Sequence, residues 1–196
     1  IAGTSIIILD RPNPLGGEMV SGNIPKKSLA YPTSFIPIPY RHGMTIGELA
    51  RLLNTENGHG VDLMIIPMDN WQGQPWSEIG LEWAPISPGI STMDDLERFT
   101  ITGILGADKI LENGVSTDRP YEILVHPEIT SGSNIVFSLE GLDLPGVNIL
   151  PAVSVPNTGP FAGQICNGIS ITVTDIKVLE PWTCLLYTSP SPRDRG

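Results

Sequence analysis

Two side chains suited to proton transfer, an imidazole and a carboxylate, lie close together in the string Arg41-His-Gly-Met-Thr-Ile-Gly-Glu48. Glu48 is the best placed carboxylate for general acid or base chemistry, and His42 is suited to hydrogen-bond a ligand or to tune a carboxylate. Thr45 and Glu48 also have the spacing of a capping box, in which a glutamate at the third helical position binds the N-cap backbone amide. A structural role for Glu48 therefore stays open beside the catalytic one.

A loop rich in proline and glycine, Asp10–Gly17, follows the apolar run Ser5–Leu9. Loops at the carboxyl ends of parallel strands are the usual ligand sites of α/β proteins. We therefore predict that Asp10, Arg11 and Asn13 contact a ligand, and Arg11 could hold a carboxylate through a bidentate pair. The alternative is a local network in which Asp10 and Arg11 keep the loop in shape.

Two tryptophans, Trp71 and Trp76, lie in a stretch rich in glycine and proline, residues 70–88, which we expect to be a loop. Aromatic side chains are favoured in ligand pockets, although packing against a core or a pocket wall explains them equally well. We include Trp71 among the substrate-binding residues, together with Arg41, which directly precedes His42.

The composition argues against several classes of partner. The 196 residues carry a net charge of −10 with only 11 Lys and Arg, so nucleic acid, which needs cations to neutralise its phosphates, is not expected. No apolar run reaches the roughly 20 residues of a membrane span. The spacing of His42, His59 and His126 fits no metal site, and no glycine-rich dinucleotide fingerprint is present. We expect neither a metal nor a cofactor, and a glycan ligand remains open.

The first part of the chain has the pattern of a βαβ unit. Continuous apolar runs at residues 5–9 and 61–68 predict strands that are buried on both faces of a parallel sheet. Between them, Thr45 begins a helix with an apolar stripe.

The second part mixes helices and strands. A helix is predicted from Thr92, and a second one is capped by Ser133 and stops at Gly141. Strands are predicted at residues 121–125, 147–155 and 168–175. The last of these alternates between apolar and polar residues and should bury one face only.

Both ends of the sequence are unusual. The chain opens without a methionine and directly on a β-type run, so we expect a truncated protein. Residues 184–196 resemble translated sequencing-adapter sequence, and their Ser-Pro-Ser-Pro run followed by mixed charges has no periodicity with which to pack. We expect a non-native tail there.

Several strings in this order resemble the NamZ-type exo-β-N-acetylmuramidase family, long known only as a domain of unknown function. The longest are Leu9-Asp-Arg-Pro-Asn-Pro-Leu-Gly-Gly17 and Arg41-His-Gly-Met-Thr-Ile-Gly-Glu-Leu-Ala50. Shorter ones are Asp62–Met68, Ser87-Pro88, Thr102–Gly106 and Cys166–Asp175. The resemblance covers residues 1 to about 183 and matches only the C-terminal half of the family's length.

The resemblance implies an α/β fold: the remnant of a Rossmann-like parallel-sheet domain over residues 1–88, then a smaller α+β domain over residues 89–183. It also implies a secreted, periplasmic or extracellular hydrolase that releases terminal N-acetylmuramic acid from the non-reducing ends of peptidoglycan fragments. Glycoside hydrolysis needs a proton donor and a second carboxylate. Glu48 and His42 then become the candidate catalytic residues, with Glu48 as the acid or base, and the fragment alone is expected to be inactive.

One departure from the family pattern keeps a second function open. The family's Thr-Gly-Ile-Leu-Gly string commonly continues with Glu, whereas this chain continues with Ala107 and Asp108. Asp108 is shifted by one position and has a shorter side chain, and placement matters to catalysis. The alternative is a non-catalytic protein on the same scaffold that binds cell-wall glycans.

Overall fold

The computed structural model describes residues 3–26, 28, 36–56, 58–107, 110–181 and 183. It divides the chain into two compact units, residues 1–82 and 83–196. The domain limits predicted from the sequence, 1–88 and 89–183, stay predictions. The predicted tail and Asp108 lie outside the described residues. Within the described part of the chain, no helix is both long and apolar enough to cross a membrane.

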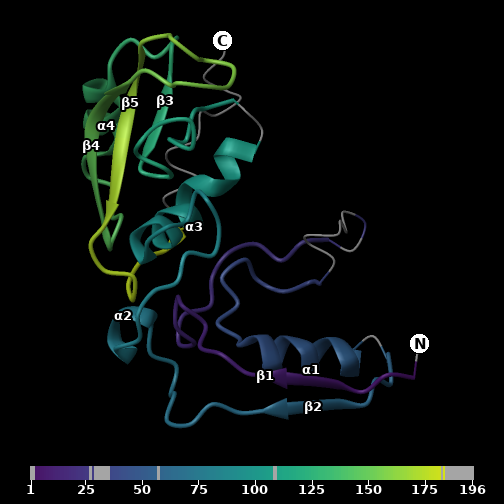
Figure 1. Ribbon diagram of the computed structural model, residues 1–196. Coiled ribbons are helices and arrows are strands. Elements are labelled where there is room, and N and C mark those ends of the chain that lie inside the picture. The colour runs from purple at the N-terminus through teal and green to yellow at the C-terminus, as the bar shows by residue number, and fades with distance from the viewer. Residues whose placement is uncertain are drawn as a thin grey trace. The chain divides into compact units, whose positions relative to one another are not determined.

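The first unit is built around a parallel pair of strands. Strands β1 (Ile6–Leu9) and β2 (Leu63–Ile66) pair with Ile6 opposite Leu63 and Leu9 opposite Ile66. Helix α1 (Ile46–Glu56) connects them and packs against both strands, as Figure 1 shows. The βαβ unit predicted from the apolar periodicity is therefore confirmed, and it places the end of β1 beside the start of α1.

The burial predicted for these strands is wrong. Only alternate side chains, such as Ile8 and Ile65, are even partly buried, while Ile7 is 62% exposed and Leu9 71% exposed. The reason is that α1 packs against the pair, and no other helix or strand of the described residues packs extensively against it. A continuous apolar run indicates a strand, but its burial depends on the elements that pack on it.

The second unit has α+β architecture. It contains, in chain order, α3 (Met93–Ala107), β3 (Ile123–His126), α4 (Gly132–Leu139), β4 (Val147–Ser154) and β5 (Cys166–Val173). The three strands form an antiparallel sheet in the order β3-β5-β4. The predicted fold class, a parallel-sheet α/β part followed by a smaller α+β part, is confirmed. Helix α2 (Trp76–Ile79) corrects the predicted loop at residues 70–88.

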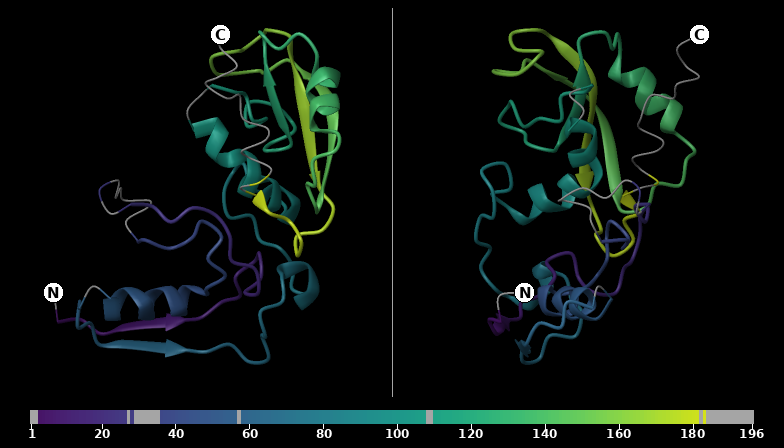
Figure 2. Two further views of the ribbon diagram at one scale, coloured as in Figure 1. Left: turned by 180° about the vertical axis from the view of Figure 1, so that it is seen from behind. Right: turned by 90° about the vertical axis from the view of Figure 1, so that its right-hand side faces the viewer.

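Strand β5 forms the centre of the second unit and is buried on both faces, against the prediction of one. Ile169 and Ile171 point to one face, and the polar Ser170 between them is also buried. Helices α3 and α4 both pack against β5, and they lie on opposite sides of the sheet in the right-hand view of Figure 2. In a central strand, the alternation of polar and apolar residues therefore does not predict which side chains are exposed.

Capping residues set the starts of the helices in this unit. Thr92 and Asp95 form a reciprocal capping box on α3, with the Thr92 N–H donating to Asp95 Oδ2 at 2.9 Å. Helix α4 is capped by Ser131, which accepts from the Asn134 N–H. The prediction that Ser133 caps this helix is therefore wrong by two positions, because the chain turns into the helix earlier at Gly132.

Candidate functional site

The start of α1 is fixed by the capping box that the sequence predicted. The Thr45 N–H donates to Glu48 Oε2 at 2.8 Å, and the Glu48 N–H donates to Thr45 Oγ1 at 3.1 Å. Glu48 is nevertheless exposed, and its capping bond engages one of its two carboxylate oxygens. Capping and a ligand contact are therefore compatible, because the same bond that caps the helix also orients the carboxylate.

Asp10 joins the end of β1 to this helix start. Its carboxylate accepts hydrogen bonds from Thr45 Oγ1 at 2.8 Å, from the Gly47 N–H at 2.9 Å and from the Arg11 N–H at 3.0 Å. The negative charge also lies at the positive end of the helix dipole. The structure thus gives Asp10 a role in positioning Glu48, and the substrate contact predicted for it stays a prediction.

The close approach of strand and helix depends on Gly47. A Cβ atom at this position would lie 2.7 Å from Ile65 Cγ2 and 2.8 Å from Asp10 Cγ. Both distances are shorter than real Cβ contacts. Only glycine therefore allows the Asp10 carboxylate to reach the first turn of α1.

The segments before α1 are held together by two further predicted site residues. Asn13 Nδ2 donates to the Met44 carbonyl at 3.0 Å, and Arg41 Nη2 donates to the Leu15 carbonyl at 2.8 Å. Arg41 is only 4% exposed. Both side chains fix the loop after β1 against the loop before α1, and their predicted substrate contacts stay predictions. Arg11, by contrast, is exposed.

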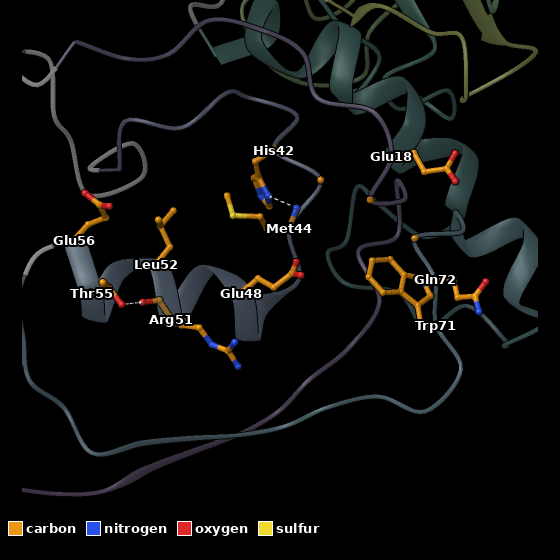
Figure 3. Close-up of a pocket in the computed structure, with 13 residues that line it drawn as sticks. Glu18, His42, Met44, Glu48, Arg51, Leu52, Thr55, Glu56, Trp71 and Gln72 are labelled. Carbon is orange, nitrogen blue, oxygen red and sulfur yellow. Dashed lines mark hydrogen bonds between the residues drawn. The ribbon is translucent and has the colours of Figure 1, made fainter.

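An open pocket with a volume of about 820 Å³ lies along α1 in the first unit. Figure 3 shows Glu48, His42 and Trp71 around it, each contributed by a different part of the chain: helix α1, the loop before it and the loop after β2. Three of the seven predicted site residues therefore meet at one cavity. The described residues that line it are Gly17, Glu18, His42, Gly43, Met44, Glu48, Arg51, Leu52, Thr55, Glu56, Trp71, Gln72 and Gly73.

The imidazole of His42 is held by its own loop. The Met44 N–H donates to His42 Nδ1 at 3.0 Å, which is drawn as a dashed line in Figure 3. The ring is half-buried, and burial lowers the pKa of His42 from its ordinary value of 6.5 because the charged form is poorly solvated. His42 is therefore neutral at neutral pH.

Trp71 forms one wall of the pocket. Its Nε1 donates to the Gln74 carbonyl at 2.9 Å, which fixes the indole within its loop. A Cβ atom at Gly17 would lie 3.2 Å from the edge of this ring, so the glycine-rich loop after β1 passes close to the indole. The indole is thus held by one hydrogen bond and by the close approach of Gly17, and a ring that is already placed suits stacking on a ligand.

Three pocket residues on α1 were not predicted from the sequence, although the helical repeat points to them. Arg51, Leu52 and Thr55 follow Glu48 at intervals of three, four and seven, the spacing that puts side chains on one helix face. Glu18 was missed because the irregular stretch after Gly17 has no periodicity from which its direction could be inferred.

The described residues offer no evident metal centre. No group of three or more His, Cys, Asp or Glu in this part of the chain is arranged to hold a metal ion. His42 and His59 belong to the first unit, and His126 is in strand β3 of the second.

The geometry can be compared with known proteins. A family model described as "Exo-beta-N-acetylmuramidase NamZ, N-terminal" matches residues 1–94, and the corresponding C-terminal model matches residues 98–189. The chain belongs to the NamZ family. Both units are matched by NamZ models, as the resemblance indicated.

Individual relatives agree with this assignment. The peptidoglycan β-N-acetylmuramidase NamZ of Bacillus subtilis (strain 168) is 34% identical over 174 residues, which are 88% of this chain and 42% of the relative. A crystal structure of a DUF1343 family protein from Bacteroides fragilis matches with a TM-score of 0.88 and 28% identity, over 94% of this chain and 49% of that one. A second B. fragilis DUF1343 structure, with a TM-score of 0.62 and 22% identity, shares the fold.

The chain thus spans less than half the length of the NamZ relative from B. subtilis and about half of the first B. fragilis protein.

Proposed function

We propose that the chain contributes the pocket of an exo-acting glycosidase that releases terminal N-acetylmuramic acid from the non-reducing ends of peptidoglycan fragments. The observation that carries the proposal is the meeting of Glu48, His42 and Trp71 at one open pocket in a NamZ family chain. A protein that reaches such a substrate works in the periplasm or outside the cell, and we propose the same location for this one.

Glu48 is proposed as the acid or base of the reaction. Glycoside hydrolysis requires a carboxylic acid that protonates the leaving oxygen and a second carboxylate that acts as nucleophile or activates water. Glu48 is exposed to the pocket and oriented by the helix cap. In this proposal its partner lies in the part of the family's length that the chain does not span, so the chain alone is inactive.

Two other side chains are proposed to bind the sugar. The fixed indole of Trp71 offers a flat surface for a pyranose ring, since sugar faces carry C–H groups that pack on aromatic rings. Arg11, which is exposed on the loop after β1, is proposed to bind the lactyl carboxylate of N-acetylmuramic acid.

The experiment is carried out on a protein of full family length that contains this chain, called the full-length form below. It is incubated with a disaccharide that ends in N-acetylmuramic acid and, in parallel, with one that ends in N-acetylglucosamine. We expect free N-acetylmuramic acid to be released from the first and little sugar from the second. The 196-residue chain alone should release neither.

The outcome separates hydrolysis from binding alone. A folded full-length form that binds the N-acetylmuramic acid disaccharide without cleaving it would contradict the glycosidase proposal. That result would favour a glycan-binding protein on the same scaffold, which the Ala107 in place of the family's common Glu would also suit.

A further inference from the structure

We propose that His42 acts as a fixed neutral hydrogen-bond donor that recognises the acetamido carbonyl oxygen of the sugar, and that it is not the acid or base of the site. This inference rests on the proposed function, because it names a group of the proposed substrate. Two observations support the inference: the hydrogen bond that Nδ1 of His42 accepts, and the charges of the side chains that line the pocket.

The bond from Met44 fixes the tautomer of His42. The Met44 N–H donates to Nδ1 at 3.0 Å, so Nδ1 must present a lone pair. A neutral imidazole carries its proton on the remaining nitrogen, Nε2, which is therefore a donor. A base would need a free lone pair at Nε2, and a general acid would need a charged ring. Burial works against that charged form by lowering the pKa of His42.

The surroundings of His42 select a neutral acceptor. The described lining residues include more negative than positive side chains. The carboxylates are Glu18, Glu48 and Glu56, and the one guanidinium is that of Arg51. In Figure 3 the Arg51 side chain extends away from His42. A carboxylate of the ligand would therefore meet mainly like charges in this pocket, whereas a carbonyl oxygen would not.

The sugar supplies such an acceptor next to the reacting centre. The acetamido group is borne by the carbon adjacent to the anomeric carbon, and its carbonyl oxygen is uncharged. One donor that is already oriented gives selectivity, because a sugar without the carbonyl leaves the Nε2–H of His42 without an acceptor. The bond from the Met44 N–H already holds the ring in this orientation before a ligand binds.

Two substitutions separate the two nitrogens of the ring. In His42→Asn the side-chain oxygen can still accept from the Met44 N–H, but the donor at the Nε2 position is lost. In His42→Gln the longer side chain can place an amide N–H near the Nε2 position. Both variants keep a polar side chain in the loop. His42→Asn replaces the acceptor at Nδ1, and His42→Gln replaces the donor at Nε2.

The test compares two ligands for the full-length form: N-acetylmuramic acid and 3-O-lactylglucose, which has a hydroxyl in place of the acetamido group. We expect the wild type to prefer the first by about tenfold, the value of one good hydrogen bond. His42→Asn should lose that preference, and His42→Gln should keep several-fold of it. Side-chain nitrogen NMR shifts should show a protonated Nε2 and an unprotonated Nδ1 in the absence of ligand.

The outcomes are distinct. Equal preferences in the wild type and His42→Asn, with both variants folded, would overturn the acetamido assignment, as would a protonated Nδ1. In either case cleavage by the wild type would leave the proposed function standing. A wild type that binds no N-acetylmuramic acid at all would overturn both proposals together.

Discussion

Replacing Glu48 by glutamine in the full-length form should reduce the release of N-acetylmuramic acid by at least about 100-fold, the scale of a lost general acid or base. Glutamine is chosen because it also occupies the third position of a capping box, so the bond from the Thr45 N–H survives. The loss should fall on kcat, because the amide still fills the space of the carboxylate but can neither give nor take the proton.

Two measurements make this result specific. Glu82→Gln removes the same charge from an exposed residue of the first unit that does not line the pocket, and it should change the rate by less than about twofold. The thermal midpoint of Glu48→Gln should match that of the wild type. If Glu48→Gln retains most of its activity while folded, Glu48 is a helix cap and nothing more.

The second large effect concerns stability and lies at the contact of α4 with the sheet. A Cβ atom at Gly132 would lie 1.9 Å from the Gly168 carbonyl oxygen in the central strand β5. Backbone cannot move aside as a side chain can, so Gly132→Ala should force the helix off the sheet. We expect a loss of about 3 kcal/mol in the free energy of unfolding, at the upper end of the cost of overpacking.

Gly89→Ala is the matched control for this prediction. Gly89 is in the same unit and, like Gly132, does not have a left-handed backbone conformation, but its nearest obstacle is the Tyr121 hydroxyl at 3.2 Å. The change there should stay within about 1 kcal/mol. Urea unfolding of the 196-residue chain measures both variants. Equal losses for the two would mean that α4 can shift away from β5 at little cost.

Local features of the sequence predicted local features of the fold. The capping box of Thr45 and Glu48 and the βαβ order of the first unit needed only short-range patterns, and the structure contains both. Burial was not predictable in this way, since it depends on distant partners. Leu9 in an apolar run is exposed, while the polar Ser170 is buried because α3 and α4 both return to β5.

The site shows the same limit. Glu48, His42 and Trp71 were predicted as site residues from their side-chain chemistry, and all three line one pocket. Asp10 and Arg41 look equally suitable in the sequence, yet their polar groups bind backbone and side-chain atoms of segments far along the chain. Sequence spacing does not predict these hydrogen bonds, because the bonded residues come together only after β1 and β2 have paired.

The most direct measurement of the central claim, that this pocket holds the terminal sugar, is a crystal structure of the full-length Glu48→Gln variant with an N-acetylmuramic acid disaccharide. We expect the terminal ring to lie against Trp71 and the glycosidic oxygen to lie within about 3.2 Å of the side chain at position 48. The His42 Nε2 should then face the acetamido oxygen. A disaccharide bound elsewhere, with the side chain at position 48 in contact with Thr45 alone, would contradict the assignment of this pocket to the terminal sugar.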